Sequence, residues 1–157
     1  MRISLGLVLL LTAGFAFSGV EGVTACARAL VIMLRNTEKA SASIECKSDP
    51  KGSAALTALA GDPVCKNYKF TVGDQKCEIL AVPYMKCVAG KLGILNDDGS
   101  INNTKILAKF KSYATSKPGC DAPEYDFGAK KCGTQINNYA FLKKAACIAS
   151  FASKYTG

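Results

Sequence analysis

Apolar residues recur at helical spacing in several separate stretches of the chain. The clearest stretch follows the polar segment NDDGSINN and holds Ile106, Leu107, Phe110, Tyr113 and Ala114 at i, i+1, i+4, i+7 and i+8. This spacing marks one face of a helix with 3.6 residues per turn. The pattern therefore predicts an amphipathic helix after residue 103, with these five side chains facing the interior.

The first half of the chain shows two further helical patterns. Residues 23–39 are rich in Ala, Leu and Met, with Cys26 in the first turn. Residues 53–60 form a shorter apolar run, for which Ser53 is the expected N-cap. The sequence KSDPKGS at 47–53 is expected to be a loop, since Asp-Pro and Gly interrupt any periodic pattern. Residues 65–75 alternate weakly and predict an extended segment.

Three more helices are expected in the second half. Residues 74–93 have apolar side chains at helical spacing, and Pro83 inside them predicts a kink or two segments. A short helix is expected near 126–132, after a loop rich in Pro and Gly. The last stretch, 137–155, is apolar over most of its circumference, which is typical of a helix buried on several sides. About six helices with little β structure predict an all-α fold.

The polar segment before residue 103 has three possible structures. As a calcium loop with Gly99 at its sixth position, it would begin at Ile94, which has no ligand oxygen, and end at Lys105, which repels the ion. A β-hairpin needs strand periodicity on both sides, whereas both flanks are helical. A turn between two helices remains, with Ser100 or Asn102 as the cap of the second.

The N-terminus has the pattern of a secretory signal peptide. Arg2 precedes an apolar run at 5–17 that is too short to span a membrane. Cleavage after Ser18 or after Gly22 fits the small residues there, and we prefer Gly22. The mature protein is then a single secreted domain of residues 23–157, and no later run is long enough for a transmembrane helix.

All the cysteines follow the predicted signal peptide. They are Cys26, Cys46, Cys65, Cys77, Cys87, Cys120, Cys132 and Cys147. An even number of cysteines in a small secreted chain predicts four disulfides, here among about 105 possible pairings. The chain has no histidine and no Cys-x-x-Cys pair, so the usual zinc spacings are absent and no metal or other cofactor is expected.

The composition also limits the possible functions. Without histidine, Ser-His-Asp and Cys-His catalytic arrangements are impossible, and a separated carboxylate pair such as Glu78 and Asp126 is a weaker alternative. We therefore expect a protein that is not an enzyme. The formal charge of +8 at pH 7 is spread along the chain, which favours anionic partners but lacks the clusters typical of nucleic-acid binding. The sequon Asn102-Asn103-Thr104 predicts N-glycosylation of Asn102.

A group of residues in the middle of the chain resembles a known family. In order, they are Tyr84, Lys86, Cys87, Val88, Leu92, Gly93, Asp98, Gly99 and Asn102. They resemble the insect odorant/pheromone-binding protein superfamily, which includes salivary and venom members. The resemblance implies the pairs Cys26–Cys87, Cys77–Cys132 and Cys120–Cys147, with Cys46–Cys65 as an additional bridge. Exchanging Cys26 for Cys46 or Cys65 is an alternative.

The resemblance and the aromatic helices together predict an internal apolar cavity. The expected wall is Val88, Ile106, Phe110, Tyr113, Tyr139, Phe141, Leu142, Ile148 and Phe151. The hydroxyl of Tyr113 or Tyr139 could orient a headgroup, and Lys109 or Lys143 could attract a carboxylate. The predicted function is a secreted carrier or scavenger of a small hydrophobic or amphiphilic ligand. The alternative is a secreted cationic effector, such as a toxin, antimicrobial or venom protein, that acts through its surface.

Overall fold

A computed structural model describes residues 23–157, and this part of the chain is all-α. Its seven helices are α2 (Ala25–Lys39), α3 (Ser41–Cys46), α4 (Pro50–Ala60), α5 (Gln75–Lys91), α6 (Asn103–Thr115), α7 (Ala122–Cys132) and α8 (Phe141–Ala152). The predicted fold class is confirmed, with α3 as a helix that the sequence did not predict. The predicted signal peptide lies outside the described residues.

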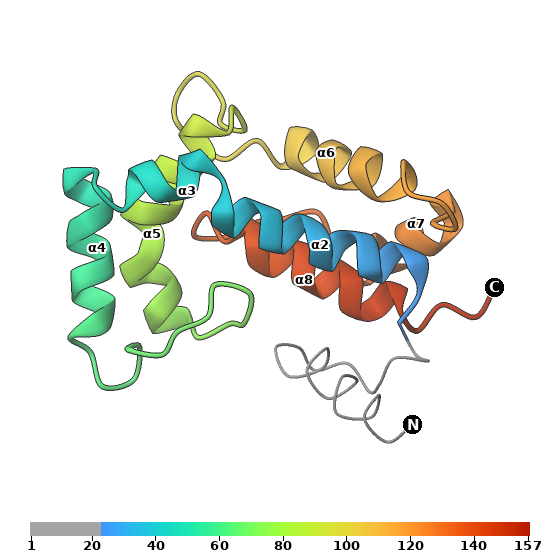
Figure 1. The fold of residues 1–157 in the computed structure, drawn as a ribbon, viewed down its shortest axis with the longest axis horizontal. Coiled ribbons are helices and arrows are strands. Elements are labelled where there is room, and N and C mark those ends of the chain that lie inside the picture. The colour runs from blue at the N-terminus through green and yellow to red at the C-terminus, as the bar shows by residue number, and fades with distance from the viewer. Residues whose placement is uncertain (1–22) are drawn as a thin grey trace.

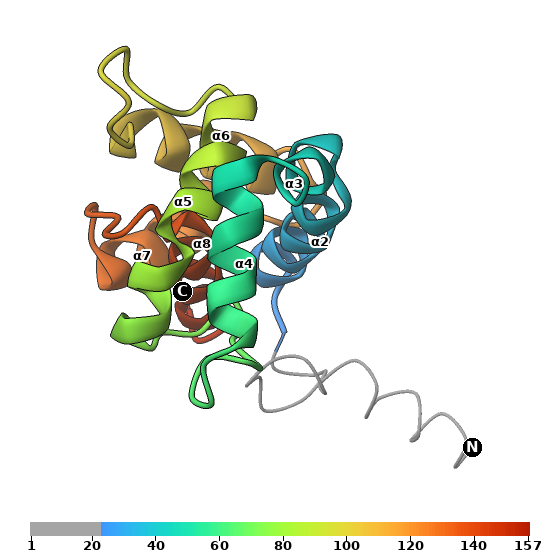
Figure 2. The same cartoon turned by 90° about the vertical axis from the view of Figure 1, so that its left-hand side faces the viewer.

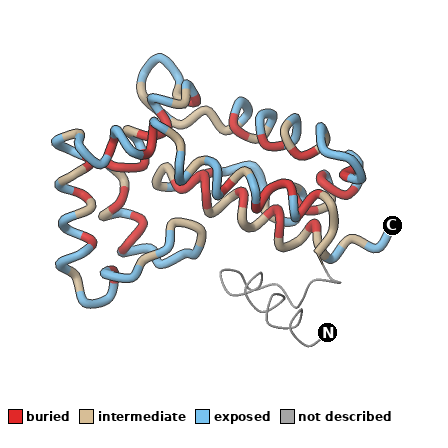
Figure 3. Tube along the Cα trace, in the orientation of Figure 1, coloured by how far each residue is buried: buried red, intermediate tan, exposed pale blue. Residues whose placement is uncertain are grey.

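The helices form two groups that meet along α3 and α5 (Figure 1). In one group α8 packs against both α2 and α7, and α6 lies along α2. In the other, α4 and α5 run side by side, as the second view also shows (Figure 2). The short α3 follows α2 directly and packs on α5, so it joins the two groups. Buried residues lie where the helices face one another (Figure 3).

The start of α4 corrects one prediction. The Asp49 side chain accepts hydrogen bonds from the backbone N–H groups of Lys51 (3.1 Å) and Gly52 (3.0 Å), and Pro50 is the first helical residue. Proline suits this position because its missing N–H has no partner in the first turn anyway. The Asp-Pro pair therefore begins a helix where a loop was expected, and Ser53 lies inside the helix.

The segment between α5 and α6 is a turn between helices, as predicted. Asn102 caps α6, because its side chain accepts a hydrogen bond of 2.9 Å from the Lys105 N–H. The turn is closed by one isolated antiparallel bridge between Leu95 and Ile101. Gly99 has φ +86°, a left-handed conformation that glycine adopts without steric cost.

Other boundaries also differ from the sequence pattern. The helix α5 is continuous through Pro83, so the two-segment alternative is wrong. Residues 65–74 form turns rather than an extended strand. The helix α7 begins at Ala122, four residues before the predicted start, with Pro123 in its first turn. The last helix, α8, is shorter than predicted, and half of its residues are buried.

Close packing between α7 and α8 depends on Gly128. A Cβ atom at this position would lie 2.5 Å from the Ile148 carbonyl oxygen and 2.9 Å from the Ala152 nitrogen. Both distances are shorter than van der Waals contact with backbone atoms that cannot rotate away. Glycine at 128 therefore sets how closely these two helices approach.

All eight cysteines are paired, but not as the resemblance implied. The bridges are Cys26–Cys120, Cys46–Cys87, Cys65–Cys77 and Cys132–Cys147, with Cα–Cα distances of 4.5, 5.9, 5.4 and 6.0 Å. None of the four preferred pairs is present, although the alternative that joined Cys46 to Cys87 is.

The physical reason lies in which elements are neighbours. A disulfide needs Cα atoms within about 7 Å. The Cys26 Sγ lies 3.6 Å from the Asp121 carbonyl oxygen, which places the start of α2 beside the segment before α7 rather than beside Cys87. The end of α3 packs on α5, and α7 packs on α8, so Cys87 and Cys147 each have another partner at hand.

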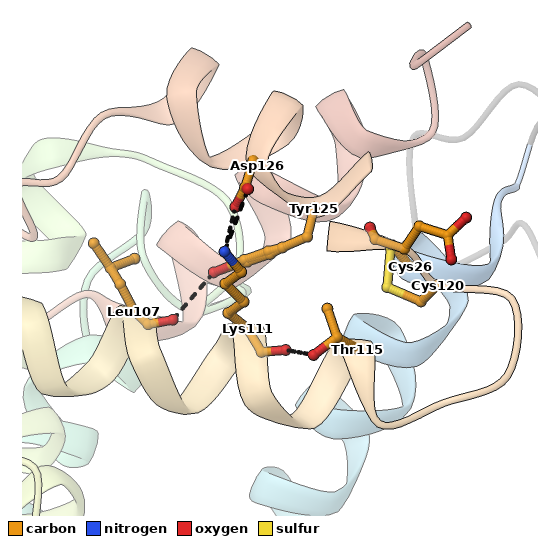
Figure 4. A network of polar contacts seen from close by, with 8 residues as sticks. Cys26, Leu107, Lys111, Thr115, Cys120, Tyr125 and Asp126 are labelled. Carbon is orange, nitrogen blue, oxygen red and sulfur yellow. Dashed lines mark hydrogen bonds and ion pairs between the residues drawn. A yellow bond between two sulfur atoms is a disulfide. The ribbon is translucent and has the colours of Figure 1, made fainter. Parts of the chain in front are cut away.

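Polar contacts hold α6 to α7 near this first bridge (Figure 4). The Tyr125 hydroxyl donates a hydrogen bond of 3.3 Å to the Leu107 carbonyl, and Lys111 forms an ion pair of 3.0 Å with Asp126. Burial, and secondarily the Asp126 charge, raises the pKa of Tyr125 well above its ordinary value. The phenol therefore stays protonated and keeps its hydrogen bond at any physiological pH.

Candidate functional site

A pocket of about 220 Å³ lies where the two groups of helices meet. We call it the inner pocket. It is lined by Glu38 of α2, Ser43 of α3, Lys47 directly after α3, Phe70 of the segment before α5, Tyr84, Met85 and Val88 of α5, and Leu142 of α8. Both groups of helices thus contribute side chains to the inner pocket.

The apolar wall of the inner pocket comes from one face of α5. Tyr84, Met85 and Val88 follow one another at i, i+1 and i+4, so they lie on the same side of the helix. All three are buried, and Leu142 of α8 is buried opposite them. These side chains provide a surface that favours apolar groups over water.

Aromatic side chains from the segment 66–73 complete this wall. The Phe70 ring lies 5.6 Å from the Tyr84 ring and 5.0 Å from the Tyr68 ring, centroid to centroid. Such edge-to-face and tilted pairs stabilise each other beyond the area that they bury. The Cys65–Cys77 bridge closes the segment at its base. Phe70 is therefore held at the pocket by ring contacts and a covalent tether, without regular secondary structure.

The polar rim of the inner pocket includes the Tyr84 hydroxyl. It donates a hydrogen bond of 3.1 Å to the Ser43 carbonyl and so ties α5 to α3. Burial raises the pKa of Tyr84, the hydrogen bond to Ser43 opposes this, and the Glu38 charge raises it further. Tyr84 is therefore a neutral hydroxyl at the rim, with lone pairs that can still accept a hydrogen bond.

A second pocket of about 360 Å³ adjoins the first, and we call it the outer pocket. Its lining is Leu34, Arg35, Glu38, Tyr68, Lys69, Phe70 and Thr71. Glu38 and Phe70 line both pockets, so the two are neighbours. Burial, followed by the charges of Glu78 and Asp74, raises the pKa of Tyr68 to about 12.

Two of the nine predicted wall residues, Val88 and Leu142, line the inner pocket. Four others are buried in the hydrophobic core: Ile106, Phe110, Phe141 and Ile148. An apolar residue on a predicted helix can serve either as core or as pocket wall, and the sequence pattern is the same. A ligand contact for these four stays a prediction.

The remaining three predicted wall residues lie outside the two pockets and have partners. The Lys117 ammonium lies 4.7 Å from the centroid of Tyr113, and Lys154 lies 5.1 Å from that of Phe151. The Tyr139 hydroxyl donates a hydrogen bond of 2.7 Å to the Gly99 carbonyl in the turn before α6. Their role in ligand binding also stays a prediction.

The two lysines considered for the mouth also lie away from these pockets. Lys109 is exposed on α6. Lys143 pairs with the buried carboxylate of Glu78, which also accepts a hydrogen bond of 3.2 Å from Asn138. This cluster borders a separate polar pocket of about 600 Å³. It joins the loop before α8 to the first turn of α5.

The sequence did not single out Glu38, Ser43, Lys47, Phe70 or Met85 as site residues. Phe70 lies in an aperiodic segment, but it is flanked by Cys65 and Cys77, and a short bridged segment rich in aromatics is a usable signal. The polar rim residues have no such signal, because their elements are brought together only by the tertiary fold. Within residues 23–157, no cluster of three potential metal ligands occurs, and no helix has the length and hydropathy to cross a membrane.

Comparison with known families identifies the family of the chain. The sequence model of the PBP/GOBP family, the insect odorant- and pheromone-binding proteins, matches residues 66–153. The chain belongs to this family. The resemblance found in the middle of the sequence is thereby confirmed. No curated protein and no solved structure matches the chain.

Family membership gives the pocket a context. PBP/GOBP proteins are non-enzymatic binding proteins for small hydrophobic ligands. The matched residues include the apolar wall, from Phe70 through Val88 to Leu142. The rim residues Glu38 and Lys47 precede the matched range. The apolar part of the pocket therefore lies in the family domain, whereas most of the charged rim comes from α2 and α3.

Proposed function

We propose that this PBP/GOBP protein is a secreted carrier or scavenger that reversibly binds a small hydrophobic or amphiphilic molecule in the inner pocket. The observation that supports this most is the apolar wall of Tyr84, Met85, Val88 and Leu142, covered by Phe70. Ligand sites are mostly apolar concavities with a few polar groups that fix orientation. The inner pocket has this composition, with Ser43, Glu38 and Lys47 as polar groups.

Secretion is supported by the four disulfides, which persist in oxidising compartments, and by the family. The predicted signal peptide agrees with export. The Asn102 side chain caps α6 through its oxygen, which leaves the amide nitrogen to carry a glycan. N-glycosylation of Asn102 therefore remains a prediction that is compatible with its structural role.

Displacement of a fluorescent apolar probe from the oxidised protein tests the proposed function. We expect one saturable site, and we expect Phe70→Ala to weaken binding about 10-fold, because burying a Phe side chain contributes about 1.5–3 kcal/mol. Phe127→Ala is the matched control. Phe127 is also half-buried and contacts a tyrosine ring, that of Tyr155 at 5.5 Å, whereas Phe70 contacts two, but Phe127 lines neither pocket.

Two results would contradict the proposal. The first is no saturable probe binding by a protein that is folded and fully bridged. The second is equal weakening by Phe70→Ala and Phe127→Ala, which would place the probe elsewhere. The first result would favour the cationic effector, for which binding to anionic vesicles should fall as salt is raised.

A further inference from the structure

We propose that the two pockets select an amphiphile with an anionic headgroup, such as a fatty carboxylate, and that Lys47 and Lys69 determine this preference. The inference rests on the carrier function proposed above and adds the chemical class of the ligand. It follows from the charges at the rim of the pockets rather than from their apolar wall.

The two lysines reach the site from different elements. Lys47 is the C-cap residue of α3 and lines the inner pocket, and Lys69 belongs to the segment 66–73 and lines the outer pocket. The pockets share Glu38 and Phe70. A ligand with its tail in the inner pocket therefore places its headgroup in a region that both lysines border.

Neither lysine is neutralised by a carboxylate of residues 23–157. The ion pairs within residues 23–157 are Lys76–Asp62, Lys91–Glu45, Lys111–Asp126 and Lys143–Glu78. Neither Lys47 nor Lys69 pairs with a carboxylate in the described part of the chain. Each can therefore offer an ammonium group with three donors to an incoming anion.

Among the described residues that line the two pockets, one side chain is a carboxylate. It is Glu38, and within residues 23–157 it stands against the two lysines Lys47 and Lys69. An ionised headgroup is attracted by this excess of positive charge, whereas an amine is attracted by Glu38 alone and repelled by the lysines. Glu38 accordingly reduces the affinity for an anion, and removing its charge should increase that affinity.

The size and chemistry of the inner pocket suit the other end of such a molecule. The side chains of Met85, Val88 and Leu142 are buried and carry no hydrogen-bond donor. An alkyl chain gains about 0.8 kcal/mol for each methylene group that it buries there. The tail thus supplies most of the affinity, and the headgroup contacts supply the selectivity between molecules with the same tail.

Three ligands with the same ten-carbon chain test the inference: decanoate, decanol and decylamine, each titrated calorimetrically at neutral pH, where the acid is ionised. We expect decanoate to bind most tightly and decylamine least. Lys47→Gln and Lys69→Gln should each weaken decanoate binding about 3- to 10-fold, as expected for the loss of one partly screened charge contact. Decanol binding should change less than about twofold.

Matched variants separate a local contact from a change in total charge. Lys109→Gln removes the same charge from an exposed position on α6 that lines neither pocket, and it should leave the affinity for decanoate unchanged. Glu38→Gln should strengthen decanoate binding and weaken decylamine binding.

The possible failures can be told apart. Saturable decanol binding, with decanoate no tighter and unaffected by either lysine variant, would overturn the anionic preference and leave the carrier function standing. Tighter binding of decylamine, lost in Glu38→Gln, would assign the selectivity to Glu38 instead and would also overturn it. If none of the three ligands binds saturably, the carrier function fails together with this inference.

Discussion

Removal of the long disulfide should lower stability more than removal of the short one, whereas removal of the short one should weaken ligand binding more. Cys26 and Cys120 are 94 residues apart in sequence, and Cys65 and Cys77 are 12 apart. All four cysteines are buried, so replacing either pair with alanine disturbs packing to a similar extent. The two double variants therefore differ mainly in the length of the loop that is opened.

The loop lengths give the expected magnitudes. In the chain-entropy model, closing a loop of 94 residues contributes about 4.7 kcal/mol, and closing one of 12 contributes about 2.8 kcal/mol. The Cys46–Cys87 bridge lies inside the long loop and shortens the path that Cys26–Cys120 closes. The difference of about 2 kcal/mol is thus an upper value, and we expect about 1–2 kcal/mol.

Urea denaturation followed by far-UV circular dichroism measures this difference, since the chain has no tryptophan to report by fluorescence. Loss of Cys26–Cys120 should lower the free energy of unfolding more than loss of Cys65–Cys77. Ligand affinity should show the reverse order. The short bridge closes the segment that carries Phe70, so its removal lets Phe70 leave the pocket.

We expect removal of Cys65–Cys77 to weaken probe binding at least about 5-fold in the folded protein. Without the bridge, the segment 66–73 has to become ordered when the probe binds, and the entropy lost in this ordering reduces the affinity. Removal of Cys26–Cys120, under conditions where the variant is folded, should change the affinity less than about twofold. The reasoning is refuted if the short bridge contributes more to stability, or if the two variants bind the probe equally well.

Three other predictions concern single side chains. Lys143→Met should lower the free energy of unfolding by about 1–3 kcal/mol, because it leaves the Glu78 carboxylate, only 4% exposed, without its ion pair. A loss no larger than that caused by replacing an exposed lysine would contradict this. The pKa of Tyr68, about 12, lies above the ordinary 10, so Tyr68 ionises first in the unfolded chain, and its contribution to stability is full below pH 10 and lost between pH 10 and about 12. In Tyr68→Phe, the free energy of unfolding measured across this range should no longer show this loss. A pH profile unchanged from that of the natural protein would refute the prediction. Gly128→Ala should lower the free energy of unfolding by about 1–3 kcal/mol, because the added methyl group forces α7 away from α8. Gly61→Ala is the control: Gly61 has φ −84°, and the nearest atom to an added Cβ lies at 3.5 Å, so this change should be neutral or stabilise the protein by about 0.4–1 kcal/mol.

The sequence predicted the helices best where burial imposes a period. In α6, Ile106, Phe110 and Ala114 are buried as their spacing requires. The sequence pattern failed where local chemistry decides the boundary. The Asp49–Pro50 pair predicts a break in the helix, but at the first turn Asp49 is a cap and Pro50 is a suitable N1 residue. Periodicity carries no information about this difference, although the capping preference does.

The disulfide map and the lining of the pocket depend on tertiary contacts. None of the four preferred disulfide pairs is present, and two of the nine predicted wall residues line the inner pocket, whereas a ligand contact for the other seven stays a prediction. Which cysteine lies beside Cys87 depends on how α3 packs on α5, and α3 itself is too short for a periodic pattern. Likewise, Phe110 and Val88 have the same apolar signal in the sequence and both are buried in the core, yet of the two Val88 alone also lines the inner pocket. Only the arrangement of the helices separates these roles.

Photoaffinity labelling tests the central claim most directly, because it reports where a bound ligand lies. The oxidised protein would be irradiated with a decanoate analogue that carries a diazirine near its terminal carbon, and the labelled residues would be identified by peptide mass spectrometry. The account predicts adducts on Phe70, Met85, Val88 and Leu142, which disappear when unlabelled decanoate is in excess. Competable adducts on Phe110, Tyr113 and Ile148 instead would contradict it and place the ligand among α6 and α8.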